Sequence, residues 1–298
     1  SFSATNGAIV LTGSGNTFGG NLALTDVGAN NVTVNYNGSL ALGAVNVTGP
    51  LSVSANGNIT QATGTGIVVT GNAAFAATNG SITLTSATNA FNGSVGLTNT
   101  GANTTVALTN NKSLALGAVN VTGALTVTDT GNITQAGNAV IAASGNASFT
   151  ATNGSIALTD ANQFSGNVSL TNTGANTTVG LTNNRALALG SVNVTGPLSV
   201  NVSGNVTQAT NAAVVTSGNA SFAATNGAIT LANGGNVFGG NLGLANTGAS
   251  NNVTVSYNGA LSLGSVNVAG PLSVTATGNI SQATNTSVSA SGNASLTS

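Results

Sequence analysis

Apolar residues occur along the chain as short alternating pairs, separated by segments rich in Gly and Asn. Alternation over three to five residues has the period of a β-strand, not of a helix. The Thr and Val residues around the pairs favour strands further. Asn-Gly dipeptides between the pairs tolerate positive φ and favour tight turns. The pattern therefore predicts strands and turns throughout and no helix; the pairs of the first copy include Ile9/Leu11, Leu22/Leu24, Val32/Val34, Leu40/Leu42, Val45/Val47, Leu51/Val53 and Ile67/Val69.

One stretch recurs along the whole chain. It reads GNASFTATNGSIAL at residues 145–158, and close variants occupy residues 71–84 and 218–231. Phe2, Phe75, Phe149 and Phe222 mark the same phase and Leu296 marks a fifth, so the period is about 73–74 residues. This indicates four repeats at about 1–74, 75–148, 149–221 and 222–295, with the start of a fifth at 296–298. Since the chain opens and closes inside the repeat, we expect one continuous segment, 1–298, of a longer protein.

Strands this short favour a β-solenoid over separate sandwiches, because each coil can pair with the coil before it. A repeat of this length would form three or four coils. Four coils of about 18 residues lie closer to known coiled repeats, but the pattern leaves the coil length open. We expect residues one period apart, such as Phe75 and Phe149, to lie in register along a common axis.

The eight phenylalanines fall at two phases of the repeat and form four pairs. Because the spacing within each pair is close to one coil, we expect the rings to stack on neighbouring coils as a structural core ladder. The pairs are Phe2/Phe18, Phe75/Phe91, Phe149/Phe164 and Phe222/Phe238.

The composition excludes several classes of protein. With 41% hydrophobic and 2% charged residues, the chain does not resemble a disordered protein. Two basic residues are too few for nucleic-acid binding, which depends on Lys and Arg. With a net charge of −1, copies of the chain repel one another only weakly, which favours self-association, end to end or lateral. No apolar run reaches the ~18 residues of a membrane-spanning helix, so we expect no membrane span.

Residues for catalysis or metal binding are scarce. Without His, Cys or Glu, the chain lacks an ordinary general base and a thiol nucleophile. Asp26, Asp129 and Asp160 lie at three different phases of the repeat, so we expect them not to converge. Three Asp residues also cannot supply a series of calcium sites. The sequence predicts no enzyme, no catalytic residues, no cofactor and no metal.

Two basic residues are candidates for a weak contact with an anionic polysaccharide. Lys112 and Arg185 share one phase, in TNNKSL and TNNRAL, and we expect them on one face. The alternative, two solvated turn residues, is favoured because Gly38 and Gly259 replace them in the outer copies.

Other polar patterns allow two readings. Asn-x-Ser/Thr sequons mark glycosylation sites in secreted eukaryotic proteins, but their regular placement favours turn Asn residues that bond neighbouring coils. Thr pairs such as those at Thr83/Thr85 and Thr126/Thr128 suggest an ice-binding face, although Ser, Ala and Gly dilute them. The sequons include Asn46, Asn58, Asn120, Asn132 and Asn193.

Several phrases of the repeat resemble those of filamentous-haemagglutinin-like adhesins: GNITQA, SVNVTGPLSV, the NxFxGxVxLTNTGAN pattern and ATNGSITL. The resemblance covers the whole chain. It implies a right-handed parallel β-helix in a large bacterial surface or secreted protein, commonly exported by two-partner secretion. It also implies adhesion or biofilm-matrix functions.

Two functional hypotheses follow. The first is a non-enzymatic extracellular adhesin or matrix fibre segment, a stiff rod that binds an unknown surface receptor or polysaccharide through many weak contacts. The second is a self-assembling filament or sheath protein.

Overall fold

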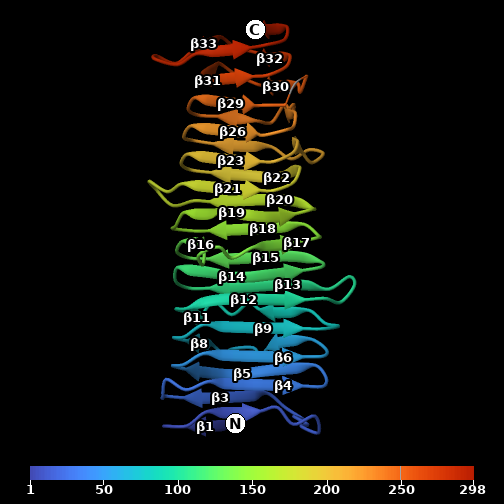
Figure 1. The fold of residues 1–298 in the computed structure, drawn as a ribbon. Helices are drawn as coiled ribbons and strands as arrows, with labels where there is room; N and C mark the ends of the chain where they lie inside the picture. Colours follow the sequence, from blue (N-terminus) through green and yellow to red (C-terminus); the bar gives the residue numbers. More distant parts are fainter. Residues whose placement is uncertain (249) are drawn as a thin grey trace. The chain divides into compact units, whose positions relative to one another are not determined.

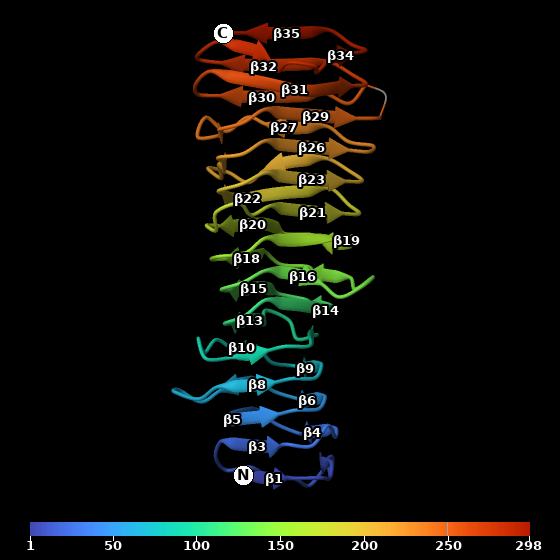
Figure 2. The same ribbon diagram turned by 90° about the vertical axis from the view of Figure 1, so that its left-hand side faces the viewer.

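The computed structural model describes residues 1–248 and 250–298. The polypeptide divides into two units, Ser1–Ala147 and Ser148–Ser298, and each is described by itself. Each unit is a parallel β-solenoid in which the chain passes alternately through two sheets, here called sheet A and sheet B (Figures 1 and 2). The described residues form strands joined by turns and irregular segments and include no helix, as the alternating pattern predicts. The right-handed sense stays a prediction.

In the first unit, the chain crosses repeatedly between sheet A and sheet B. Sheet A contains β1 (Phe2–Ala4), β3 (Leu22–Asp26), β5 (Leu40–Val47), β7 (Ile59–Gln61), β8 (Ile67–Val69), β10 (Ile82–Leu84), β11 (Ala90–Phe91), β13 (Thr105–Asn110) and β15 (Ala124–Asp129). Sheet B contains β2 (Ile9–Leu11), β4 (Val32–Tyr36), β6 (Leu51–Ala55), β9 (Ala73–Ala77), β12 (Ser94–Asn99), β14 (Leu114–Val121), β16 (Ile133–Gln135) and β17 (Ile141–Ala143).

The second unit follows the same scheme. Its sheet A contains β18 (Ala147–Ala151), β20 (Asn167–Asn172), β22 (Leu187–Val194), β24 (Val206–Gln208), β25 (Val214–Thr216), β27 (Ile229–Leu231), β28 (Val237–Phe238), β30 (Val253–Tyr257), β32 (Leu272–Ala276) and β35 (Ala294–Thr297). Its sheet B contains β19 (Ile156–Phe164), β21 (Val179–Asn183), β23 (Leu198–Val202), β26 (Ala220–Ala224), β29 (Leu242–Asn246), β31 (Leu261–Val268), β33 (Ile280–Gln282) and β34 (Val288–Ala290).

One turn of the solenoid is longer than the ~18 residues expected for four coils per repeat. The shortest turns pair Cα atoms such as Val106↔Leu125, and the longest pair Cα atoms such as Ile82↔Val106. One repeat therefore makes neither three nor four turns. In the first unit it makes three and a half, because the register runs Phe2↔Leu24↔Val45↔Ile67 on sheet A and the chain then crosses to Phe75 on sheet B.

Within a unit, the expectation that residues one period apart lie in register on one face is therefore wrong. Phe2 lies in β1 of sheet A, and its equivalent Phe75 lies in β9 of sheet B. In the second unit Phe149 lies in β18 of sheet A and Phe222 lies in β26 of sheet B. Each repeat begins on the sheet opposite to the one on which the preceding repeat of its unit began.

The phenylalanine pairs also differ from the expected ladder. Phe75 and Phe91 face each other across the interior from opposite sheets, with ring centroids 5.9 Å apart in an edge-to-face arrangement. Along its own sheet Phe75 has the aliphatic partners Val53 and Leu97. The same edge-to-face contact joins Phe2 to Phe18, Phe149 to Phe164 and Phe222 to Phe238. Phe2 is 39% exposed and Phe18 half-buried, whereas the other six rings are buried.

The core between the sheets consists of the inward-facing residues of most strands; β1, β33, β34 and β35 contribute no buried residue. Strands such as β3 and β6 alternate buried and accessible positions, which is the pleat of a strand with one face in the interior. Small aliphatic residues occupy most inward positions, as the paired apolar pattern predicts.

The corners require residues with little side chain or with positive φ. At one phase of the repeat the left-handed conformation falls on Gly64 (φ 77°), Asn138 (φ 58°) and Asn211 (φ 61°), the two residue types that tolerate it. At another corner, a Cβ on Gly196 would collide with the backbone carbonyl oxygen of Thr177 in the preceding turn. Pro197 then precedes β23, where its missing N–H costs no ladder bond.

Candidate binding surface

The outward faces of both sheets carry small, uncharged side chains in register. On sheet B of the second unit one outward ladder runs Gly180↔Ser199↔Ser221↔Gly243. On sheet A of the first unit another runs Ala41↔Thr60↔Thr83↔Ala107↔Thr126. The two ladders thus contain only threonine, alanine, serine and glycine, and the surface offers hydroxyl groups and short apolar side chains without charge.

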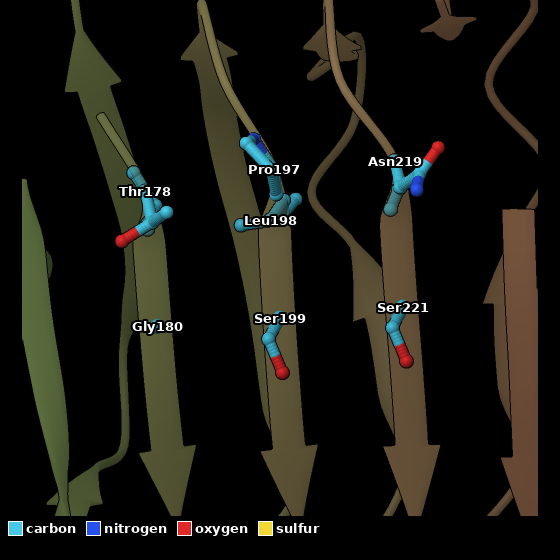
Figure 3. Close-up of a pocket in the computed structure, with 9 residues that line it drawn as sticks. Thr178, Gly180, Pro197, Leu198, Ser199, Asn219 and Ser221 are labelled. Atoms are coloured by element: carbon cyan, nitrogen blue, oxygen red, sulfur yellow. The ribbon is translucent and has the colours of Figure 1, made fainter. Parts of the chain in front are cut away.

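Each unit has a shallow hollow at the same place on this surface. In the second unit it lies over the first residues of β21, β23 and β26 and is lined by Thr178–Gly180, Pro197–Ser199 and Asn219–Ser221 (Figure 3). In the first unit it lies over β4, β6 and β9 and is lined by Asn31–Thr33, Pro50–Ser52 and Asn72–Ala74. The two sets of residues are equivalent positions two repeats apart, so the same hollow recurs in both units.

The two basic residues stay exposed in turns. Lys112 lies between β13 and β14, and Arg185 lies between β21 and β22. Arg185 donates hydrogen bonds to Gln163 Oε1 (2.9 Å) and to Ser165 Oγ (3.2 Å), so its guanidinium is held by neighbouring turns. The turn of Gly38 joins sheet B to sheet A, whereas the equivalent turn of Lys112 joins sheet A to sheet B. Equivalent turns therefore alternate between the two edges of a unit; a shared face for Lys112 and Arg185 stays a prediction.

Only some of the sequon asparagines form the hydrogen bonds between neighbouring coils that the sequence suggests. Asn46, Asn120 and Asn193 project outward from strands and are exposed. Asn58 lies in a turn and does connect two coils, because its Oδ1 accepts from the backbone N–H of Ser81 at 2.8 Å. Asn132 is exposed in a turn and also interacts with another group of the protein.

A different set of asparagines connects the coils from inside. Asn89 accepts from the backbone N–H of Ile67 (2.9 Å) and donates to the carbonyl oxygens of Leu84 (3.1 Å) and Thr109 (3.2 Å). Each bond satisfies a backbone group that a strand end leaves unpaired. The buried members are Asn89, Asn99, Asn110, Asn162, Asn172, Asn183, Asn236 and Asn246.

Among the comparisons with known proteins, only the comparison with protein-family models gives a match, and that match is to the repeats. A family model described as "Repeats of unknown function (DUF5649)" matches residues 29–98, 102–171, 174–245 and 250–298. The chain belongs to this family. The matched stretches follow one another at about the period found in the sequence. Neither the curated proteins nor the solved structures that were compared contain a match.

The described parts of the DUF5649 repeats hold neither a metal cluster nor a membrane-spanning helix. Within residues 1–248 and 250–298, no group of three or more His, Cys, Asp or Glu residues lies close enough together to hold a metal ion. Those same residues form no helix with the length and apolar character needed to span a membrane.

Two aspartates depart from the pattern of the sequence repeat. Asp26 occupies the position of Asn99, Asn172 and Asn246, and Asp129 occupies the position of Ala55, Val202 and Ala276. Both are buried at the ends of sheet A strands in the first unit, β3 and β15, with several turns between them, so they do not converge.

Each of these carboxyl groups has one oxygen without a hydrogen-bond partner. Asp26 Oδ1 accepts from the N–H of Gly28 (2.9 Å), and Asp129 Oδ1 accepts from Asn110 Nδ2 (3.2 Å). The second oxygen of each is buried and unpaired within the described residues. Burial raises the pKa of Asp129 from 3.8 to about 6, against the lowering effect of the bonds from Asn110 and from nearby backbone groups.

The raised pKa of Asp129 predicts that the DUF5649 solenoid loses stability as the pH rises. Between pH 4 and 6 the folded state binds more protons than the unfolded state, so the free energy of unfolding falls with pH. The raised pKa corresponds to a loss of at most ~3 kcal/mol by pH 7. Urea unfolding at pH 4 and pH 7 measures it. The Asp129→Asn variant should lack this part of the pH dependence, and an identical pH profile in the variant would contradict the assignment.

The comparison of Asp26 with Asn99 predicts a reciprocal pair of variants. Asn99 Nδ2 donates to the carbonyl oxygen of Gly80, whose equivalent in the first repeat is Gly7. Asp26→Asn restores a donor there and should raise the free energy of unfolding by about 1–3 kcal/mol at pH 7. Asn99→Asp places a carboxylate oxygen against a carbonyl oxygen and should lower it by a similar amount. The two changes in urea midpoint must have opposite signs for the account to hold.

Proposed function

We propose that this chain is a non-enzymatic segment of an extracellular adhesive or matrix fibre on a bacterial surface. The observation that supports the proposal is the repeated outward face, where small hydroxyl, amide and apolar side chains lie in register on successive strands. A face of this kind offers each bound group only a few weak hydrogen bonds. It offers them many times along one chain.

The attachment would depend on multivalency. When many weak sites are joined in one body, each further contact is intramolecular, and avidity exceeds single-site affinity by about 10² to 10⁴. A solenoid suits this task because its backbone groups are paired between turns, which holds the sites at fixed spacings. The stiff rod expected from the sequence belongs to this proposal.

The resemblance to filamentous-haemagglutinin-like repeats supports the same reading and a secreted location. The family of the chain is one of unknown function, so this finer identity remains part of the proposal. The lack of strong charge on the outward ladders also suits lateral association of copies, which is the filament alternative.

Attachment should rise steeply with the surface density of the chain. Fluorescent beads that carry the full chain at increasing densities are incubated with bacterial cells and with abiotic surfaces, and retained beads are counted after washing. We expect little retention at low density and retention that grows faster than linearly at high density. Beads with the heat-unfolded chain serve as the control.

Equal retention of folded and unfolded chains, or no retention at any density, would overturn the adhesive role. Electron microscopy of the free chain separates the alternative: single particles agree with an adhesive segment, whereas ordered bundles or polymers indicate a self-assembling filament.

A further inference from the structure

The hollow at Pro197 combines an apolar floor with a polar rim. Gly180, which is in register with Ser199, has no side chain, so the outer surface dips there, and Pro197 lines the same hollow. Ser199 and Ser221 lie in register on β23 and β26, and their hydroxyl groups point the same way (Figure 3). Both serines are exposed, and neither hydroxyl has a protein partner within the described residues. The hollow therefore offers free hydroxyl groups next to an apolar ring.

An oriented amide completes the rim. Asn219 Oδ1 accepts from the backbone N–H of Asn241 in the next turn at 2.9 Å. In the first unit the equivalent Asn72 Oδ1 accepts from the N–H of Ser94 at 3.0 Å. This bond fixes each amide group, and the Nδ2 donor is left for a bound molecule. A donor that is already ordered costs less entropy on binding than a mobile one.

The backbone of the hollow cannot hold a peptide by strand addition. β23 pairs with β21 on one side and with β26 on the other, and β21 and β26 have further partners in β19 and β29. Since no strand edge is free here, an occupant must bind through the side chains. The lining residues carry no charge, so an anionic or cationic group would lose its hydration without gaining an ion pair.

We propose that the hollow is a subsite for an uncharged polysaccharide that lies along the solenoid axis. Sugar rings present hydroxyl groups at their edges and C–H groups on their faces, which match the serine, asparagine and proline groups of the hollow. Successive strands lie ~4.8 Å apart, close to the advance of one pyranose ring along an extended chain. The inference rests on the adhesive role proposed above and names its ligand class.

The test measures binding of the full chain to dextran, hydroxyethylcellulose and galactomannan, with alginate as an anionic comparison, by affinity electrophoresis at two salt concentrations. Binding to at least one neutral polymer should be insensitive to salt and stronger than binding to alginate. A variant with Ser52→Ala, Ser199→Ala and Ser221→Ala should bind that polymer about tenfold more weakly, because one or two hydrogen bonds are lost at each hollow.

The matched control carries Ser191→Ala, Ser203→Ala and Ser265→Ala, three exposed serines outside the hollow, and should bind like the unmodified chain. Equal weakening in both variants, no neutral polymer bound, or self-association that only the hollow variant abolishes would overturn the inference. Bead attachment without neutral-polymer binding would overturn this inference and leave the adhesive role standing. Loss of both would remove the adhesive role as well.

Discussion

Hydrogen bonding between successive turns is the constraint on which each unit depends. A strand such as β6 exchanges backbone bonds with the strand one turn before it, β4, and the strand one turn after it, β9, so the strands must stay in register from turn to turn. The corners then leave almost no space for side chains. Glycine therefore occupies positions where a carbonyl group of the preceding turn comes close, as at Gly196. The inward positions are narrow, and small aliphatic residues with few phenylalanines fill them.

The extra half turn in each repeat decides on which sheet the residues of that repeat are displayed. Because one repeat covers three and a half turns, each repeat of a unit presents its residues on the sheet opposite to that of its neighbour. A feature encoded once per repeat is thus displayed on both faces of a unit. For a body that attaches through weak contacts, display on two faces permits contacts with two surfaces at once.

The sequence predicts much of this fold and less of the surface. The alternating pairs and the Asn-Gly turns are sufficient for the strands and corners, and the recurrence of one stretch shows the repeat. The coil length could not be predicted from the sequence, because strands on both sheets have the same alternating pattern. Nothing in this pattern distinguishes a half turn from a whole turn. The stacking expected for Phe75 and Phe91 failed for that reason: the segment between them turns from sheet B to sheet A instead of completing a coil, so the rings meet across the interior.

The buried asparagines had a signal in the sequence. In Val95-x-Leu97-x-Asn99, the asparagine continues the inward alternation of the two apolar residues, so it points into the core. A polar residue there needs partners, and the strand end next to the corner supplies unpaired backbone groups. The hollows had no such signal, because they arise from side chains that only the register of three strands brings together.

The half-turn relation is tested most directly by a spin-label distance within the first unit. Thr25 in β3 of sheet A and Thr98 in β12 of sheet B are one repeat apart. With cysteine-linked labels at both positions, the distance should clearly exceed the ~17 Å rise of three and a half turns, because the sheet spacing of ~10 Å and the two tethers add across the axis. A distance of roughly 14 to 19 Å, the rise of three or four whole turns on one face, would contradict the account.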